Sequence, residues 1–495
     1  CALAACFLWR TVQRPLLVFD SGFQLSFLSM AAIFWAVPFV HAFWIRKKEE
    51  SKRFGARIRA ALLTSWTVLV VISPVISYAY FETSRYAMLI NLLVLPMLSF
   101  LLLALLVGLA CMILAAMFGM PAYHVFLFPA TLTARLILRL SLWFEHLPGN
   151  VCITGRPQAA ELLLYIVYFG GGLLLFCLAS RLESFARRRR MKTGKNAVTN
   201  RMWFRTGSLL AVLITGFMIP DALHRRPPAA PELTMLDVGQ GDGFIFRFPD
   251  GGTFLIDCGN TYRDDLWERV VEPALLYYGI DTVDAWLLTH FDMDHISAYV
   301  QREQEIAKAR EQDPGYDPRI RCRRLLISQN DSPEELEDLC RKKPDPPVYT
   351  LTAGMRFSVG GMQADCLLPD PAFPAVTEND ASVVLRMECN GLRLLFCGDM
   401  SREQEIFLLE RGADLSADIL KVAHHGSGHS TCDAFAEAVS PKLALISVGK
   451  NSYGHPAPDV LTRLALTGSD IRMTNRKGAV IVVLKDPVQA YSYLP

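Results

Sequence analysis

Residues 88–117 contain no Asp, Glu, Lys or Arg, and this uninterrupted apolar stretch limits the chain more than any other feature. As an α-helix it would be about 45 Å long, because a helix rises roughly 1.5 Å per residue. The hydrocarbon core of a bilayer is only about 30 Å thick. The stretch is therefore longer than one span requires, and it predicts a membrane-embedded region.

Other apolar segments predict further spans. The candidates are residues 23–45, 60–81, about 129–144, 162–180 and 207–219. Their number stays open, since 88–117 exceeds one span and the segment 121–148 carries Arg135 and Arg139. Long basic side chains can reach the membrane surface, so this last segment suits an interfacial amphipathic helix as well as a span.

The charges divide the chain in two. Residues 1–230 carry 24 Lys and Arg against 8 Asp and Glu, whereas residues 231–495 carry 26 against 40. A hydrophobic content of 52% and a mean hydropathy of +0.26 exclude a disordered or fibrous chain. We expect a partial, all-α polytopic membrane domain over residues 1–225, a Pro-rich linker over 226–231 and a second domain over 232–495.

Two basic clusters indicate a topology: residues 46–59 and 181–205 are rich in Lys and Arg and lie beside apolar segments. The positive-inside rule puts both in the cytoplasm. A last crossing by residues 207–219 would place the second domain on the opposite side. If that short segment lies in the interface instead, the domain stays inside. The chain begins at Cys1 in an apolar run, so we expect an upstream region to be missing.

The second half follows a different pattern, in which short apolar runs such as 254–257, 285–288, 392–396, 419–423 and 443–448 alternate with helix-like segments. This alternation predicts a layered α/β domain. The 12 cysteines form no CxxC pair, which argues against a structural zinc knuckle. Sites in such folds form where strands end.

The loop THFDMDH follows one predicted strand and holds four candidate metal ligands, His290, Asp292, Asp294 and His295. Imidazole and carboxylate together suit Zn, Mn or Fe(II), and a tight cluster can hold two ions roughly 3.5–4 Å apart. The alternative is a polar turn in which the two acids have no ligand role.

Later strand ends add Asp399, which could bridge two cations, and then His424, His425 and His455. Five of the six histidines of the second half lie at such positions. The sixth, His429, is expected to be an ordinary loop residue.

These motifs resemble those of the metallo-β-lactamase fold, an αββα sandwich that holds one or two metal ions. More narrowly, LDVGQGDGFIFRFPDGGTFLIDCG, LLTHFDMDHISA, NDASVVLRM, LLFCGDM, LKVAHHGS and SVGKNSYGHP are similar to the C-terminal domain of the ComEC family of bacterial competence proteins. In the first half, DSGFQLSFLSMAAI and NLLVLPMLSF resemble that family's membrane domain.

The resemblance implies DNA uptake in natural transformation. A multi-pass channel in the bacterial cell membrane would pass single-stranded DNA, and an extracytoplasmic metal-dependent nuclease domain would hydrolyse the non-imported strand. Implied partners are DNA, the lipid bilayer, a DNA receptor and a cytoplasmic motor, and the chain could form a homo-oligomer. The alternatives are a hydrolase-like domain that only binds DNA, or a membrane-anchored hydrolase of another phosphoester.

The resemblance also implies residue roles. The metal ligands would be His290, Asp292, Asp294, His295, Asp399 and one of His424 and His425, with Asp380 a weaker candidate. Asp257 would orient a ligand histidine or serve only as a turn residue. Asp294 would orient or deprotonate the attacking water, and His424, His425 or His455 would donate hydrogen bonds to the phosphate.

Asp292 stands where many members of the wider fold have histidine. A carboxylate there makes the site harder and favours Mn or Mg over Zn. The loop GQGDG at residues 239–243 lacks the Lys of a P-loop and is expected to be a hairpin turn. The net charge of minus 14 in the second half disfavours extended docking on duplex DNA, which usually needs a basic face.

Overall fold

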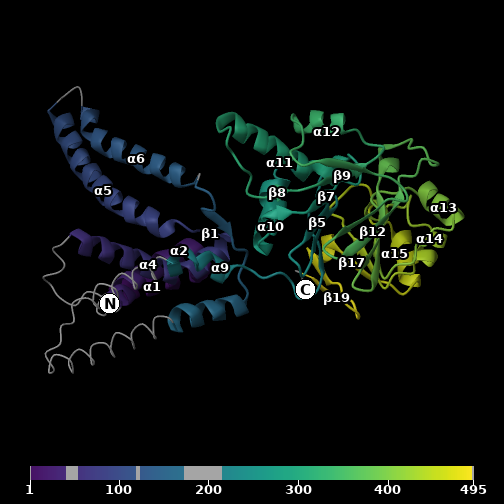
Figure 1. Cartoon of the computed structure of the whole chain (residues 1–495), viewed down its shortest axis with the longest axis horizontal. Coiled ribbons are helices and arrows are strands. Elements are labelled where there is room, and N and C mark those ends of the chain that lie inside the picture. The colour runs from purple at the N-terminus through teal and green to yellow at the C-terminus, as the bar shows by residue number, and fades with distance from the viewer. Residues whose placement is uncertain are drawn as a thin grey trace, which may run out of the picture. The chain divides into compact units, whose positions relative to one another are not determined.

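The computed structural model describes residues 2–38, 40, 54–118, 123–145, 147–171 and 214–492. The chain forms two compact units, Cys1–Arg225 with Leu276–Gly279, and Arg226–Leu275 with Ile280–Pro495 (Figure 1). Each unit is described by itself.

The N-terminal unit is helical. Its described helices are α1 (Ala2–Gln13), η1 (Pro15–Phe19), α2 (Ser21–Ala31) with the π-helical turn η2 (Ala32–Ala36), α4 (Phe54–Tyr80), α5 (Ala87–Met117), η4 (Tyr123–Leu127), α6 (Phe128–Glu145), the apolar helix Ala159–Gly171 and α9 (Ile219–Leu223). A short antiparallel pair joins β1 (Glu82–Ser84) to β2 (Val151–Ile153).

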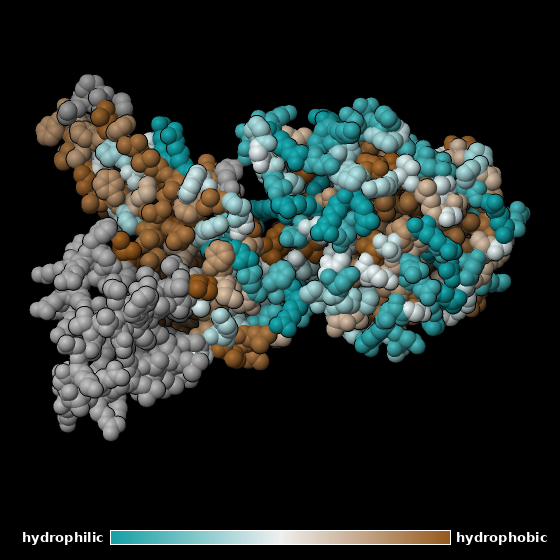
Figure 2. Space-filling view, viewed as in Figure 1, coloured by the Kyte–Doolittle hydropathy of each residue, from teal (hydrophilic) through white to brown (hydrophobic). Residues whose placement is uncertain are grey.

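Three of these helices are long and apolar enough to cross a membrane, over Ala60–Tyr80, Ala87–Met117 and Val125–Phe144. The stretch 88–117 is one continuous helix, α5, although Pro96 lies inside it. Most of its large apolar side chains are exposed, and Figure 2 shows the brown surface they form together with α6. A surface of this kind suits lipid as its solvent.

Several predicted features lie outside the described residues. These are residues 41–53, which hold most of the first basic cluster and the end of the span predicted over 23–45, and residues 172–213, which hold the second basic cluster and parts of the last two predicted spans.

The C-terminal unit contains two large mixed sheets. The first has the strand order β10-β9-β7-β5-β4-β3-β18-β19, in which β5, β7, β9 and β10 run parallel and the others antiparallel. Its strands are β3 (Glu232–Met235), β4 (Gly243–Arg247), β5 (Thr253–Asp257), β7 (Ala285–Leu287), β9 (Leu325–Ser328), β10 (Val348–Leu351), β18 (Val480–Val483) and β19 (Gln489–Ser492).

The second sheet has the order β11-β12-β13-β14-β15-β16-β17, with β14 to β17 parallel. Its strands are β11 (Arg356–Val359), β12 (Met362–Leu368), β13 (Val384–Cys389), β14 (Leu392–Phe396), β15 (Ile419–Lys421), β16 (Leu443–Ile446) and β17 (Asp470–Met473). A separate parallel pair joins β6 (Thr282–Val283) to β8 (Arg321–Cys322).

The helices of this unit are η5 (Trp267–Val271), α10 (Glu272–Tyr278), α11 (Met293–Gln312), α12 (Pro333–Cys340), η6 (Glu378–Ala381), α13 (Arg402–Glu410), η7 (Ala423–Gly426), α14 (Asp433–Val439), α15 (Pro458–Leu466) and α16 (Thr474–Lys477).

The two large sheets pack face to face. One buried cluster joins residues of both sheets, with Phe244 of β4 against Phe396 of β14 at 5.0 Å between ring centroids. Outside the first sheet, Trp286 of β7 packs on Tyr299 of α11. Outside the second, a further cluster joins β14, β15 and β16 to α13, α14 and α15. The predicted αββα sandwich is confirmed.

Candidate metal centre

The carboxyl ends of parallel strands from both sheets meet at one edge of the sandwich. Asp257 ends β5, and His290 follows β7 in the first sheet. In the second sheet, Asp399 follows β14 and His425 follows β15. Such ends are the usual location of sites in α/β sheets, because each strand there releases its chain into a loop.

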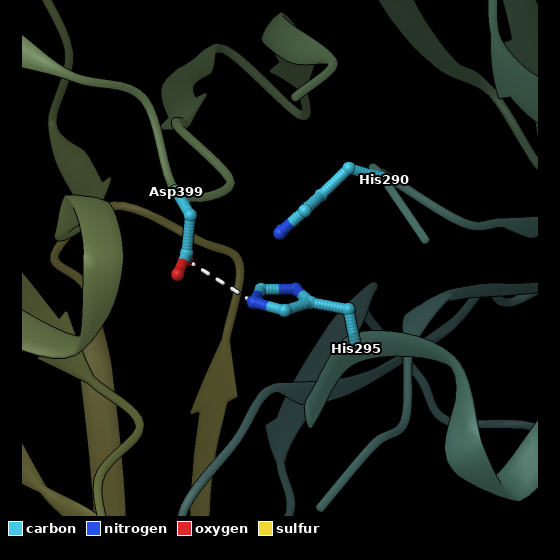
Figure 3. A group of neighbouring side chains, drawn as sticks. All are labelled: His290, His295 and Asp399. Carbon is cyan, nitrogen blue, oxygen red and sulfur yellow. Dashed lines mark ion pairs between the residues drawn. The ribbon is translucent and has the colours of Figure 1, made fainter. Parts of the chain in front are cut away.

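The side chains at this edge form overlapping groups whose possible ligand atoms lie within 4.8 Å of one another. The groups are His290 with His295 and Asp399; Asp294 with His295 and His425; Asp242 with Asp399 and His425; and Asp242 with Asp257 and His295. Figure 3 shows the imidazoles of His290 and His295 directed toward the Asp399 carboxylate, with His295 Nε2 3.1 Å from Asp399 Oδ1.

Asp257 holds His295 in place. Its Oδ2 lies 2.9 Å from His295 Nδ1, and its Oδ1 accepts a hydrogen bond of 2.8 Å from the Thr289 backbone N–H. Gly259 allows the loop after β5 to approach α11 this closely, because a Cβ at that position would lie only 2.2 Å from His295 N. The carboxylate therefore fixes the tautomer and leaves Nε2 free toward the site.

His424 and His425 point in different directions although they are adjacent. Both have positive φ values, 48° and 53°, in the left-handed region, and their rings are inclined at 80°. His425 is 1% exposed, and its Nδ1 donates to the Ser447 carbonyl at 2.9 Å, while its Nε2 lies 3.4 Å from Asp294 Oδ2. His424 Nε2 lies 3.7 Å from Asp399 Oδ2 and its side chain is 29% exposed. The geometry thus favours His425 over His424 as a ligand.

Two buried residues that sequence reasoning missed complete the group. Lys421, the last residue of β15, ion-pairs with Asp242, donates to the Gly398 carbonyl at 2.7 Å and lies 3.6 Å from Asp399 Oδ1. Asp242 belongs to the loop predicted to be only a hairpin turn. The strand register explains its position, because β4 is antiparallel to β5 and Gly243 pairs with Asp257, which places Asp242 at the same edge.

These charged groups shift one another's pKa values. Burial alone raises the pKa of a carboxyl, but His295 and His425 hold the pKa of Asp399 well below its usual range, and Lys421 and His425 lower the pKa of Asp242 to about 2. Burial alone lowers the pKa of an imidazole, yet Asp399 and Asp242 raise the pKa of His425 to about 10. Without a metal ion, protons on His295 and His425 balance part of the carboxylate charge.

Other predicted residues lie around this group. Asp292 is the N-cap of α11, and its Oδ2 lies 3.5 Å from His290 Nε2. His455 stacks edge-on against His424 at 5.5 Å between centroids. Burial and the imidazoles of His424 and His425 lower the pKa of His455 to about 4, so its ring is neutral at pH 7.

Asp380 differs from expectation, because the structure does not bring it into any of the ligand groups. Its Oδ2 accepts hydrogen bonds from the backbone N–H groups of Val376 and Thr377, and its Oδ1 accepts one from Ser401 Oγ. The residue closes a capping box with Thr377. Both oxygens are therefore already used, which explains why Asp380 is a poor ligand candidate.

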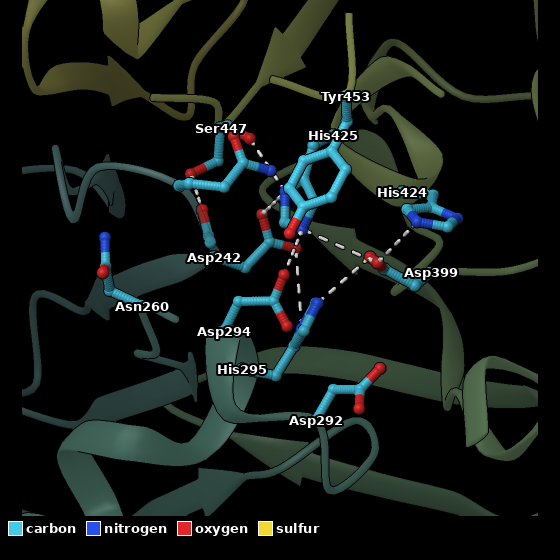
Figure 4. A network of polar contacts seen from close by, with 12 residues as sticks. Asp242, Asn260, Asp292, Asp294, His295, Asp399, His424, His425, Ser447 and Tyr453 are labelled. Atoms are coloured by element: carbon cyan, nitrogen blue, oxygen red, sulfur yellow. Dashed lines mark hydrogen bonds and ion pairs between the residues drawn. The ribbon is translucent and has the colours of Figure 1, made fainter. Parts of the chain in front are cut away.

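The group opens into a cavity of about 350 Å³. We call the buried group Asp242, Asp257, His295, Asp399, Lys421 and His425 the floor, of which Asp399 and His425 line the cavity, and we call Tyr262, His424, Tyr453 and His455 the rim. Figure 4 shows the contacts among Asp242, His295, Asp399 and His425, with His424 and Tyr453 beside them. The cavity is lined by Gln240, Thr261, Asp292, Met293, Asp294, Asn379, Asp399, His424, His425, Tyr453 and His455.

Comparisons with known proteins match the two halves of the chain to different protein families. The family model "Competence protein" matches residues 1–180, and the model of the metallo-beta-lactamase superfamily matches residues 236–301. The chain thus joins a competence-protein domain to a metallo-beta-lactamase domain.

Two curated relatives are similar to this chain over nearly all of its length. ComE operon protein 3 of Bacillus subtilis is 26% identical over 520 residues, covering all of this chain and 59% of the relative. Competence protein ComA of Neisseria gonorrhoeae is 25% identical over 485 residues, covering 97% and 57%. The chain is therefore similar to these competence proteins along nearly its whole length, and it spans less than two thirds of theirs.

Among solved structures, the metallo-beta-lactamase fold protein YhfI from Bacillus subtilis matches with a TM-score of 0.34 and 14% identity, covering 50% of this chain and 98% of that one.

The metallo-beta-lactamase fold implies a divalent metal, and the residues present fit one. The Nε2 atoms of His290, His295 and His425 and Oδ1 of Asp399 are buried, and their contacts of 3.1 to 3.6 Å are ion-pair contacts within this charged group. In neutral His425, Nδ1 must carry the hydrogen because a carbonyl only accepts, so the lone pair of Nε2 is available. Imidazole with carboxylate is a donor set for Zn, Mn or Fe.

Proposed function

We propose that this chain acts in DNA uptake during natural transformation. Residues 1–225 would form part of a membrane passage for single-stranded DNA, followed by the linker 226–231. Residues 232–495 would form a metal-dependent hydrolase that cleaves phosphodiesters of the non-imported strand. The observation that carries the hydrolase role is the set of buried imidazole nitrogens and carboxylate oxygens that lie within 4.8 Å of one another.

The proposed ligands are His290, Asp294, His295, Asp399 and His425, with Asp292 beside them. A divalent ion held there would supply Lewis acidity, which makes water more acidic and offsets phosphoryl charge. Asp294 remains the proposed base or orienter for water. Its pKa is lowered despite its burial, chiefly by His425, so it is ionised at neutral pH and can accept a hydrogen bond.

The rim histidines have a different proposed task. Burial lowers the pKa of His424 as well as that of His455, so both rings are neutral at pH 7. A neutral imidazole donates through one N–H, which suits hydrogen bonding to a phosphoryl oxygen rather than full charge neutralisation. Zn and Mn are the proposed metals, and Mg is a further candidate.

The test uses the full chain purified in detergent and stripped of metal. Mn²⁺, Zn²⁺ or Mg²⁺ is added separately, with end-labelled single- or double-stranded DNA. We expect cleavage with at least one ion, a loss of about 100-fold or more in Asp294→Ala, and little change in Asp250→Asn, whose side chain lies in the turn at the other end of β5. Absence of cleavage with every ion would leave a domain that at most guides DNA.

Localisation is a separate proposal. We infer a multi-pass protein of the bacterial cell membrane with the hydrolase unit on the extracytoplasmic side, supported by the three apolar helices and the basic clusters of the sequence. A reporter that is active only in the cytoplasm, fused after Pro495, should be inactive. Activity of that reporter would overturn the orientation. A DNA receptor, a motor and self-association remain proposed partners.

A further inference from the structure

The rim carries two exposed aromatic side chains that the proposed hydrolysis does not use. Tyr262 is 61% exposed and Tyr453 is 59% exposed, and their hydroxyls lie 3.1 Å apart. Tyr453 lines the cavity, and Thr261, the neighbour of Tyr262, lines it as well. The two tyrosines come from the loops after β5 and β16, in different sheets.

The same local arrangement presents both rings. In Asn260-Thr261-Tyr262 and Asn451-Ser452-Tyr453, the asparagine Oδ1 accepts a hydrogen bond from the tyrosine N–H, at 2.6 and 3.1 Å. The asparagines are themselves anchored, because Asn260 Nδ2 donates to the Val238 carbonyl and Asn451 Nδ2 to those of Gly449 and His455. The backbone under each ring is therefore set before any ligand arrives.

A row of rings connects this rim to the candidate ligands. The Tyr453 and His455 rings lie 5.8 Å apart at an angle of 36°, and the His455 and His424 rings lie 5.5 Å apart at 81°. His424 in turn lies 3.7 Å from Asp399 Oδ2. A group held on Tyr453 would thus be near whatever binds at Asp399.

The charge of the cavity restricts what that group is. Among the described residues that line it, none is Lys or Arg, whereas Asp292, Asp294 and Asp399 are present. Phosphate contacts therefore supply little affinity here, although they dominate most DNA binding. Stacking on an aromatic ring needs no positive charge and accepts any base. In a duplex, neighbouring bases cover those faces.

We propose that Tyr453, held by Tyr262, is a stacking platform for an unpaired nucleobase of single-stranded nucleic acid, next to the phosphodiester at the candidate metal centre. This proposal rests on the proposed hydrolase function and adds its substrate class: a single strand or a frayed end, not an intact duplex. It explains how the C-terminal unit, which has a net negative charge, can bind a nucleic acid, which is also negatively charged.

The test measures binding and cleavage separately. Binding of a short fluorescent oligothymidylate to the metal-stripped full chain is compared for wild type, Tyr453→Leu, Tyr453→Phe and the control Tyr491→Leu. Tyr491 is also exposed and hydrogen-bonded, but lies on β19 outside the cavity lining. We expect binding to weaken roughly 5- to 100-fold in Tyr453→Leu and about twofold or less in the others.

An abasic oligonucleotide of the same length has the same phosphates but no bases. Wild type and Tyr453→Leu should bind it equally, and the salt dependence should be the same for both because no phosphate contact is lost. Equal oligothymidylate binding by wild type and Tyr453→Leu, or an equal loss for the abasic strand, would overturn the platform. Metal-dependent cleavage that persists in that case would leave the hydrolase standing. Absence of cleavage with ring-dependent binding would remove the hydrolase and leave the platform.

Discussion

On the floor of the cavity, Lys421 and Asp242 are at most 1% exposed, whereas on the rim Tyr262 and Tyr453 are more than half exposed. The floor is held by opposite charges removed from water, and the rim by neutral groups in contact with it. Breaking a buried ion pair leaves an uncompensated charge, while an exposed contact is easily replaced by water. We therefore expect the floor to determine stability and metal binding, and the rim to determine which substrate binds.

The strongest test of this comparison removes the buried cation. We expect Lys421→Met to lower the free energy of unfolding of the metal-free C-terminal unit by about 3–5 kcal/mol, because Asp242 and Asp399 lose their buried positive partner. Urea titration of the full chain in detergent, followed by brief proteolysis, would measure it.

The matched control is Lys442→Met, since Lys442 pairs with Asp418 at 2.9 Å but is 67% exposed. Its loss of stability should be much smaller than that of Lys421→Met, because water readily replaces an exposed ion pair. Added Mn²⁺ should recover part of the Lys421→Met loss, because the ion brings positive charge to the same carboxylates. Equal stability of the two variants would show that the buried pair contributes no more than a surface pair.

The second test concerns metal affinity. Asp257→Asn keeps the size of the side chain but removes the charge that orients His295, so Mn²⁺ should bind about 10- to 100-fold more weakly. Titration of the metal-stripped protein, followed by the electron paramagnetic resonance signal of free Mn²⁺, measures this change. Asp250→Asn is the control, and an unchanged affinity in Asp257→Asn would remove Asp257 from its positioning role.

The third test uses pH. The pKa of His425 is raised to about 10 in the folded, metal-free protein, against about 6.5 for an ordinary histidine. The stability this proton provides is fully present below about pH 6.5 and is lost as pH rises through 10. The slope in between is about 1.4 kcal/mol per pH unit for one proton.

Urea titrations of the metal-free chain at pH 7.5 and 8.5 would show this loss, and His425→Asn should flatten it. Metal replaces the proton, so the loaded protein should change less over the same interval. A metal-free protein that becomes more stable with rising pH would contradict the assigned charge of the floor.

Much of the floor was predictable, and the reason is topological. In the floor, His295, Asp399 and His425 each follow a parallel strand, as does the neighbouring His290. An apolar run gives way to polar residues at these points, so the pattern is visible in the sequence. Lys421 was not predicted because it is the last residue of a strand and not part of the loop that follows. Asp242 was not predicted because it comes before an antiparallel strand, β4, and not after a parallel one. Asp380 was predicted as a weaker ligand candidate from the NDAS motif of the family resemblance, whereas the TEND sequence also fits the capping box that uses its carboxylate.

The fold was predicted and is confirmed, whereas of the rim only His424 and His455 were predicted and the two tyrosines were not. Tyr262 and Tyr453 are 191 residues apart, and their meeting depends on how the two sheets pack. Each sits in a similar Asn-X-Tyr turn, yet that repeat has no meaning until the loops are placed together. In the N-terminal unit, the composition alone did not tell whether residues 88–117 form one helix or more than one. The structure shows a single helix, α5, over this stretch.

The smallest expected effect comes from Tyr262→Phe, which deletes one hydroxyl of the 3.1 Å contact and keeps both rings. An exposed neutral hydrogen bond is easily replaced by water, so the stability should stay close to that of wild type and oligothymidylate binding should change by about twofold or less. Fluorescence anisotropy resolves such a change beside Tyr453→Leu. If Tyr262→Phe were as harmful as Tyr453→Leu, the joined hydroxyls rather than the ring face would hold the strand, and the rim would depend on a polar contact as the floor does.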